Sequence, residues 1–366
     1  MPKPTFAFTI PSIHDSTSLD CRIYLPKTFT ESATASISQP EQSRGPCSAS
    51  AENQAQSRSN IKAAILAHPY ASLGGSYDDP VVGFVVDELL SQGFVCGTFN
   101  FRSVPCYSFG ISLFNIYLDL TYYRGAQGSK GRTSWTGKPE RADYISFIGL
   151  MTSYLRALLQ SDTNTGDNTI DAARKSIELI LGGYSYGSLT VTQLPPLADM
   201  QLLFSAPAAD TAASDIVQKA RYIAAETIPR IRQVVSPTPD EDNDRPVPPT
   251  VGSNMPDCQV RYLLISPLLP PVSFFLNPSI GSVLGAFNRT AAPSGDTTLT
   301  SNPTLAVFGS EDIFTSASKL RTWSKKMQAA SHGAFEWLEV DGASHFWREE
   351  GVEDEMRQRI ARWVSR

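Results

Sequence analysis

The chain has 366 residues, of which 41% are hydrophobic and 18% are charged, and its formal net charge is −5 at pH 7. This composition is ordinary for a soluble globular protein and allows one large domain or two small ones. The negative charge, without any cluster of lysine and arginine, argues against a nucleic-acid-binding surface.

The N-terminal sequence MPKPTFAFTI lacks the apolar core of a secretory signal, and no segment approaches the roughly 20 apolar residues that span a bilayer. The five cysteines lack the paired spacing of zinc ligands. We therefore expect a cytoplasmic protein with reduced thiols, no membrane span, and no nucleic acid, metal or cofactor among its ligands.

Two segments precede the expected core. Residues 4–26 contain the strand-like runs TFAFTI and CRIYLP, which predict an opening hairpin. Residues 28–60 are rich in Ser, Ala, Gln and Glu and hold few large apolar side chains. Such a segment cannot bury enough surface to offset its chain entropy, so we expect a disordered loop.

From residue 61 onward, continuous apolar strands alternate with helices. We expect helices from Pro139, over 316–330 and over 352–364. The expected strands are IKAAILAH (61–68), FVCGTFNF (94–101), IELIL (177–181), RYLLIS (261–266), TLAVFG (304–309) and EWLEVDG (336–342). This alternation predicts a single α/β domain over 1–366, with a mostly parallel sheet covered by helices on both faces.

Residues 207–257 interrupt the alternation. Their first part contains the helix-prone run DIVQKARYIAAE, and their second part contains SPTPDEDNDRPVPP, rich in proline and aspartate. An insertion between two core units at this position is typical of a lid or cap over a binding site, so we expect 207–257 to be a lid.

The segment GGYSYGS (182–188) contains a G-x-S-x-G motif centred on Ser185. It follows a buried strand and precedes the helix start YGSLTVTQL. In that setting the motif predicts a nucleophile elbow, where glycines permit a tight turn that presents the serine at a helix N-terminus. A glycine-rich turn whose serine only caps the helix is the alternative.

A serine hydroxyl becomes a good nucleophile only beside a base, and the chain offers four histidines. His14 precedes the core, and His332 stands at a predicted helix end. His68 ends the first core strand. His345, in VDGASHFW, follows the last strand and so lies at the same sheet edge as Ser185, which makes it the expected base.

The acid that orients the imidazole is expected in AVFGSEDIF, just past the preceding strand. We prefer Asp312 to Glu311 from its place in the turn. The order Ser185, Asp312, His345 matches the chain order of hydrolases with this architecture.

With these motifs the chain resembles the α/β-hydrolase superfamily, and specifically the serine-hydrolase branch of dienelactone-hydrolase-like proteins. The resemblance extends over roughly 61–102 and 125–366, without the lid. It rests on AHP and FNFR at two strand ends and on the late motifs G-x-x-D and G-x-x-H-F. It implies an α/β-hydrolase fold with a lid insertion. Dienelactone hydrolases proper usually use cysteine where this chain has Ser185, so the resemblance implies no substrate.

The resemblance also implies an oxyanion hole made of backbone N–H groups. One donor is Tyr186, directly after the nucleophile, and the other comes from the loop AHPYASLGGSYDD. In the related H-G-x motif the donor lies two residues past the histidine, which is Tyr70 here. His68 then shapes the loop. For Tyr70, a simple glycine-rich loop is the alternative.

Residues 103–124 separate FNFR from GAQGSKGRTSW, although relatives in this branch join the two directly. The apolar residues of this insertion show neither helical nor strand periodicity. The segment is either a hydrophobic flap over the site or the translation of an unspliced intron, and we favour the intron.

These features predict a serine hydrolase that cleaves an ester, thioester or lactone through an acyl-enzyme. The alternatives are an acyltransferase on the same fold and a non-catalytic ligand-binding protein. Apolar and aromatic residues near the expected site favour a small-molecule substrate with an apolar acyl or aromatic group. They are Ile216, Val217, Tyr222 and Ile223 of the lid, and Tyr184, Tyr186 and Trp347. Packing of the lid onto the sheet is the alternative for these side chains.

Overall fold

A computed structural model of the 366-residue chain describes most of the expected core. It covers residues 1–29, 60–102, 112–113, 116–117, 129–131, 134, 137–161, 176–235, 257–269 and 295–366. Of the segment 28–60, residues 28–29 lie in a 3-10 turn and residue 60 begins a strand, and the rest of the predicted loop lies outside the described residues. The prediction for the second half of 207–257 lies outside them as well. So does the prediction for 103–124, apart from a short ladder of β5 (Ser112–Leu113) with β6 (Ile116–Tyr117).

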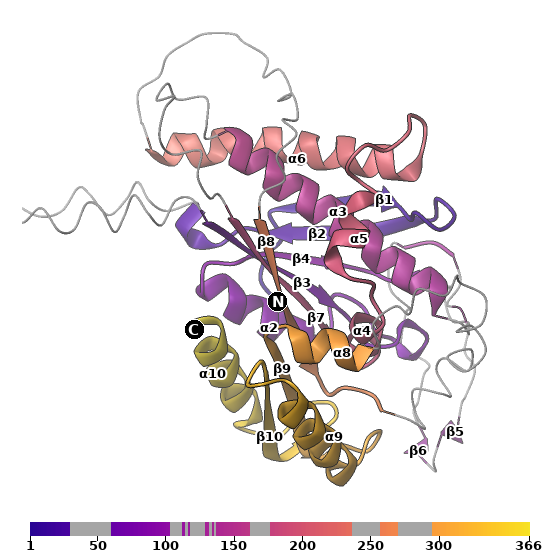
Figure 1. The fold of residues 1–366 in the computed structure, drawn as a ribbon, viewed down its shortest axis with the longest axis vertical. Coiled ribbons are helices and arrows are strands. Elements are labelled where there is room, and N and C mark those ends of the chain that lie inside the picture. Colours follow the sequence, from indigo (N-terminus) through magenta and orange to yellow (C-terminus); the bar gives the residue numbers. More distant parts are fainter. Residues whose placement is uncertain are drawn as a thin grey trace, which may run out of the picture.

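An eight-stranded sheet in the order β1-β2-β4-β3-β7-β8-β9-β10 forms the centre of the molecule (Figure 1). Its strands are β1 (Phe6–Pro11), β2 (Ser18–Tyr24), β3 (Asn60–Ala67), β4 (Val95–Phe99), β7 (Ser176–Tyr184), β8 (Asp257–Ile265), β9 (Thr304–Glu311) and β10 (Phe335–Ser344). The pairings β1–β2 and β2–β4 are antiparallel, and all the others are parallel. The predicted hairpin and mostly parallel sheet are confirmed.

Helices cover both faces of the sheet. One face packs against α2 (Pro80–Ser91) and α10 (Val352–Val364). The other carries α3 (Lys138–Ser161), α4 (Tyr186–Thr192), α5 (Leu197–Leu202), α6 (Ala212–Val235), α8 (Gly295–Ser301) and α9 (Ala317–Ala330). Short 3-10 turns η1 (Lys27–Phe29) and η2 (Ala71–Leu73) follow β2 and β3.

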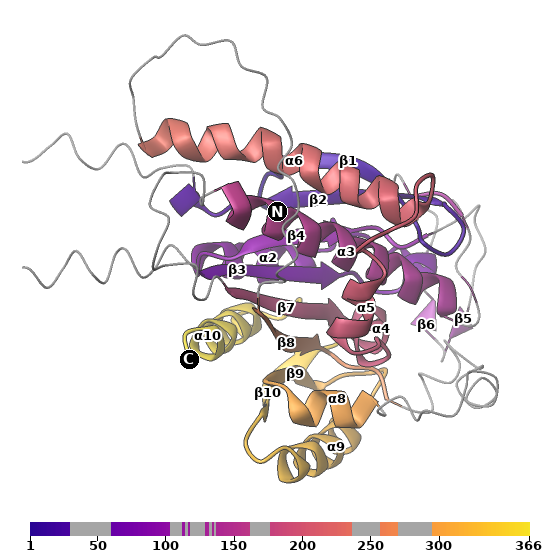
Figure 2. The same ribbon diagram turned by 45° about the horizontal axis from the view of Figure 1, so that its top comes forward.

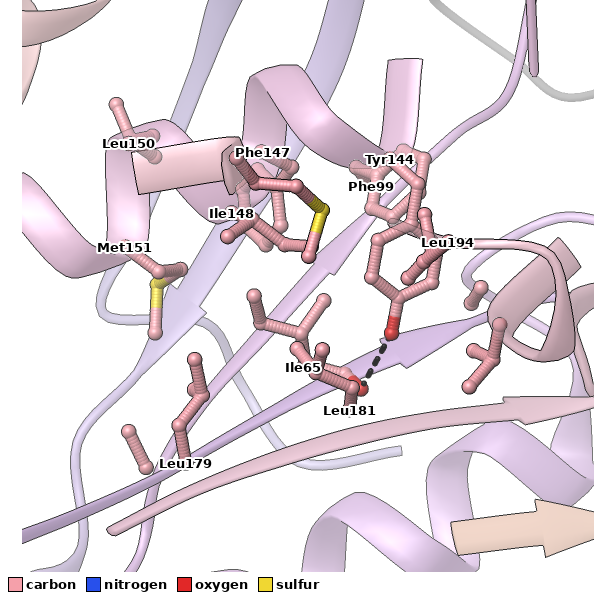
Figure 3. Close-up of a cluster of buried hydrophobic side chains, with 14 of the residues drawn as sticks. Ile65, Phe99, Tyr144, Phe147, Ile148, Leu150, Met151, Leu179, Leu181 and Leu194 are labelled. Carbon is pink, nitrogen blue, oxygen red and sulfur yellow. Dashed lines mark hydrogen bonds between the residues drawn. The ribbon is translucent and has the colours of Figure 1, made fainter. Parts of the chain in front are cut away.

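The core explains why the central strands are apolar without alternation. Ile65, Leu179 and Leu181 point to the α3 face, where Phe147 and Met151 meet them (Figure 3). The intervening residues of the same strands belong to the cluster beneath α2 and α10. Because neither face meets water, both side-chain sets are hydrophobic.

Helix α6 forms the first part of the expected lid, but it does not cover the strand ends. It runs along α3 and β1 rather than across the carboxyl ends of the strands (Figures 1 and 2). Ile216 and Ile223 are buried in the core cluster on this face, and Tyr222 is 62% exposed. The apolar stripe of α6 therefore covers α3, which would otherwise expose its outer face. A lid role for 207–257 remains a prediction for residues 236–256.

The strand order, the antiparallel N-terminal hairpin and the sharp turn between β7 and α4 together make this an α/β-hydrolase fold, as predicted.

Candidate active site

Ser185 lies in a strained turn between β7 and α4. Its backbone angles, φ 56° and ψ −113°, are sparsely populated by residues with a side chain. Two glycines make the turn possible. A Cβ on Gly183 would stand 2.3 Å from the carbonyl carbon of Gly187, and a Cβ on Gly187 would stand 2.4 Å from the Ala67 oxygen. The G-x-S-x-G spacing thus follows from close backbone contact between the strand end, the helix start and β3.

Strand pairing brings three predicted residues to one edge. Ser344 pairs with Glu311 at the end of the β9–β10 ladder, so the next residues, His345 and Asp312, are neighbours. The Ser185 N–H donates to the Ile265 oxygen at the end of β8, at 2.9 Å. The turn is therefore tied to the sheet at the edge where His345 lies.

The side chains of these residues form a continuous hydrogen-bonded line. His345 Nε2 lies 2.9 Å from Ser185 Oγ, and His345 Nδ1 lies 2.7 Å from Asp312 Oδ2. Asp312 is fixed in turn, because its Oδ1 accepts the N–H groups of Phe314 and Thr315 at 2.8 and 2.9 Å. All three residues of the line are buried.

This line determines where the imidazole proton resides. A carboxylate accepts hydrogen bonds, so the 2.7 Å contact corresponds to His345 Nδ1–H donating to Asp312. In that tautomer Nε2 carries a lone pair, which accepts the Ser185 hydroxyl proton. A serine with a base on its hydroxyl and a carboxylate behind that base can attack a carbonyl carbon.

Aromatic rings surround the imidazole of His345. The Phe314 ring centroid lies 4.5 Å from it, the Tyr184 ring 5.5 Å and the Phe346 ring 5.6 Å. These rings keep water from the sides of the imidazole, and a low local dielectric strengthens its hydrogen bonds.

Tyr186 and Tyr70, the two predicted oxyanion donors, also lie together. Tyr186 is the first residue of α4, so its N–H has no carbonyl one turn earlier within the helix. Tyr70 directly precedes the 3-10 turn η2, and its ring packs edge-on against the Tyr186 ring at 5.1 Å.

His68 shapes the loop that carries Tyr70, as expected. The Phe101 N–H donates to His68 Nε2 at 2.9 Å, so Nδ1 carries the ring proton and donates to the Pro69 oxygen at 2.6 Å. Burial lowers the pKa of His68 to about 4, because the charged imidazolium would lose its hydration. His68 is thus neutral and joins the end of β3 to the end of β4.

Tyr184 and Trp347 support the histidine loop rather than line a substrate wall. Both are buried. The Tyr184 hydroxyl donates to the His345 carbonyl oxygen at 2.8 Å, and Trp347 Nε1–H donates to Ser266 Oγ at 3.0 Å. Both side chains therefore pack within the protein, and the apolar substrate stays a prediction.

The sequence reasoning missed two partly exposed apolar residues that follow Asp312 and His345 in the chain. Ile313 follows Asp312 and is 56% exposed, and Phe346 follows His345 and is 38% exposed. Phe346 packs against Phe314 at 6.0 Å between ring centroids. The available signal was their position, since each directly follows a residue assigned to the site.

A buried ion pair anchors the strand end FNFR and was also missed. Arg102 Nε and Nη2 donate to the two oxygens of Asp143 on α3 at 2.9 and 2.6 Å, and Arg102 Nη1 donates to Asp15 at 2.8 Å. The Arg102 guanidinium holds the pKa of the Asp15 carboxyl well below its usual range. These bonds join the end of β4, α3 and the β1–β2 turn.

A cavity of about 730 Å³ lies at the opposite, amino edge of the sheet. Part of its charged lining is paired within the chain: Arg261 Nη1 donates to Glu178 at 2.7 Å, and Arg366 Nη1 donates to Glu336 at 3.0 Å. It includes none of the predicted site residues. Its lining comes mainly from the starts of β7 and β8, the segment before β9 and the C-terminal end, so it is remote from Ser185.

Among the described segments of the chain, no cluster of three or more His, Cys, Asp or Glu is arranged to hold a metal ion. Within the same segments, no helix is both long and apolar enough to cross a membrane.

No protein-family model matches the chain, and no curated protein matches its sequence. Similar solved structures include an α/β serine hydrolase homologue from Coxiella burnetii, at 16% identity and a TM-score of 0.42 over 99% of this chain and 98% of that one. Protein XC6422 from Xanthomonas campestris, described as a serine hydrolase without lid, has 14% identity and a TM-score of 0.44 over 100% and 95%. Esterase Pf2001 from Pyrococcus furiosus has 11% identity and a TM-score of 0.46 over 98% and 90%. These likenesses are too distant to transfer an activity.

Proposed function

We propose that this protein is a serine hydrolase that cleaves an ester, thioester or lactone through an acyl-enzyme. The observation that carries the proposal is the line from Ser185 Oγ through His345 to Asp312, with contacts of 2.9 and 2.7 Å. It supplies a nucleophile, a base and an orienting carboxylate in hydrogen-bond contact before any substrate arrives.

In the acylation step, Ser185 Oγ bonds to the carbonyl carbon and its proton passes to His345 Nε2. The carbonyl oxygen becomes an oxyanion, which the N–H groups of Tyr186 and Tyr70 stabilise. As the tetrahedral intermediate collapses, His345 gives the proton to the leaving oxygen or sulfur. Water then attacks the acyl-enzyme, with His345 as base again, and releases the acid and the free Ser185 hydroxyl.

The surroundings of His345 support an apolar group in the substrate. Because His345 delivers the proton to the leaving group, side chains next to it contact that part of the substrate. Phe346 is 38% exposed and its ring lies 5.6 Å from the imidazole, and burying it against an apolar group is favourable by about 25 cal/mol for each Å² removed from water. We infer a small-molecule ester with an aliphatic or aromatic leaving group.

An alkyl fluorophosphonate probe tests the proposal, since it phosphonylates a serine that has a working base. We expect labelling of the wild type and none of Ser185→Ala. Ser324→Ala is the matched control, because Ser324 is a buried serine of α9 remote from the site. The control variant should label like the wild type.

Turnover of p-nitrophenyl esters over a range of acyl lengths completes the test. Labelling that survives in Ser185→Ala refutes the assignment of the nucleophile. Labelling without turnover of any ester would instead favour a binding protein, and acyl products formed only with an added alcohol would favour an acyltransferase.

A further inference from the structure

Tyr184, the residue before the nucleophile, contacts the histidine rather than the substrate side of the site. Its hydroxyl donates to the His345 carbonyl oxygen at 2.8 Å, and its ring lies 5.5 Å from the imidazole at an interplanar angle of 34°. Only 4% of the residue is exposed.

Two consecutive residues therefore hold one histidine at both ends. Tyr184 binds the backbone oxygen of His345, and Ser185 binds its Nε2 atom at 2.9 Å. Tyr184 is the last residue of β7 and pairs with Ile265 of β8, so its backbone is fixed by the sheet. The Tyr184 hydroxyl thus fixes the position of His345 relative to the backbone that also carries Ser185.

The loop's own hydrogen bonds hold His345 less tightly. The Phe346 N–H reaches Ser344 Oγ at 3.3 Å, and the Trp347 N–H reaches the Ser344 oxygen at 3.4 Å. Both are longer than the ordinary 2.9–3.0 Å. Trp347 also has a φ of 56°, so this loop keeps a turn that costs energy. Bonds of ordinary length also hold this stretch: the Ser344 N–H donates to Glu349 at 3.0 Å and Trp347 Nε1–H donates to Ser266 Oγ at 3.0 Å. The bond from Tyr184, at 2.8 Å, is the one that reaches the backbone oxygen of His345 itself.

The Tyr184 hydroxyl keeps its proton at neutral pH and so remains a donor. Burial raises the pKa of this phenol, and the negative charges of Asp79 and Asp312 raise it further. The bond to His345 therefore does not depend on a titration.

We propose that Tyr184 is a positioning residue, whose hydroxyl holds the His345 backbone so that Nε2 stays in reach of Ser185 Oγ. This inference rests on the proposed function, because the position of His345 matters for turnover only if Ser185 is the nucleophile. It accounts for the tyrosine at the first variable position of the GYSYG motif.

The test compares Tyr184→Phe with Tyr144→Phe. Tyr144 is a matched control, because it is a buried tyrosine whose hydroxyl also donates to backbone oxygens, of Gly182 at 2.9 Å and of Ile65 at 3.2 Å (Figure 3). It contacts the same strand, β7, but not the histidine loop. Each substitution removes one phenol hydroxyl and leaves the ring in place.

We expect Tyr184→Phe to lower kcat for a p-nitrophenyl ester about tenfold, the effect of one lost buried hydrogen bond. KM should stay within about twofold, since the phenol does not touch the substrate. Tyr144→Phe should keep both parameters within about twofold of the wild type. The rates are divided by the concentration of active sites, measured as the amount of protein that the fluorophosphonate probe labels at saturation. A loss of folded protein then does not appear as a loss of kcat.

A second measurement does not depend on turnover. The proton shared by His345 Nδ1 and Asp312 should give a low-field ¹H NMR resonance, which we expect to shift or broaden in Tyr184→Phe and to stay in place in Tyr144→Phe. A wild-type kcat with an unmoved resonance in Tyr184→Phe overturns the inference, and so does an equal loss of kcat in both variants. If the wild type itself lacks turnover, the proposed function fails while the resonance still reports on Tyr184.

Discussion

Replacing Ser185 by glycine and by alanine separates the strain of the turn from the loss of the hydroxyl. Both variants lose Oγ and its hydrogen bond to His345, so the free energy of that bond does not contribute to the difference in stability between them. They differ in the Cβ atom, which alanine keeps at φ 56° and ψ −113°. A residue with a side chain in such a region costs about 1–3 kcal/mol, and glycine removes most of that cost.

Glycine also gives the unfolded chain more freedom, which offsets about 0.4–1 kcal/mol of the gain. We therefore expect Ser185→Gly to be more stable than Ser185→Ala by about 1–2 kcal/mol. In a domain of this size that difference raises Tm by about 1–2 °C for each kcal/mol. Neither variant should hydrolyse esters.

Urea unfolding followed by tryptophan fluorescence measures the difference. The same pair of substitutions at Ser324, inside α9, is the control. There alanine should be the more stable by about 1 kcal/mol, because glycine is unfavourable within a helix. If the glycine variant at position 185 is no more stable than the alanine variant, the turn is not strained and the reasoning is wrong.

Three further predictions test the surroundings of the site. Asp143→Ala should lower the free energy of unfolding by about 3–5 kcal/mol in urea titrations, because it leaves Arg102 buried without its main partner; a loss under about 1 kcal/mol would contradict this. Gly187→Ala should abolish probe labelling, since its Cβ would stand 2.4 Å from the Ala67 oxygen; a fully labelled variant would show that the turn can relax. Burial raises the pKa of Asp79 from 3.8 to about 6, so the wild type loses stability as pH rises through that window, by up to about 3 kcal/mol. Asp79→Asn keeps an amide oxygen for the Val81 N–H and should remove this loss, and unfolding curves of both proteins between pH 4 and 7 give the comparison.

Local pattern was sufficient to locate the strands and the three residues of the line. A strand buried on both faces must be apolar throughout, so IELIL and TLAVFG were visible without knowledge of their partners. Once the strands are parallel, their carboxyl ends share one edge. Residues that directly follow them, such as Ser185, Asp312 and His345, then converge whatever the details of packing.

Which helices and strands contact one another could be learned only from the tertiary structure. The apolar stripe of α6 was visible in the sequence, but a periodicity shows which face of a helix is buried and not which surface buries it. Only the packed structure places Ile216 and Ile223 against α3. Likewise, the two tyrosines of GYSYG look equivalent in the sequence. The direction of each side chain depends on where the strand ends and the helix begins, so Tyr184 turns to the His345 carbonyl while Tyr186 packs against Tyr70.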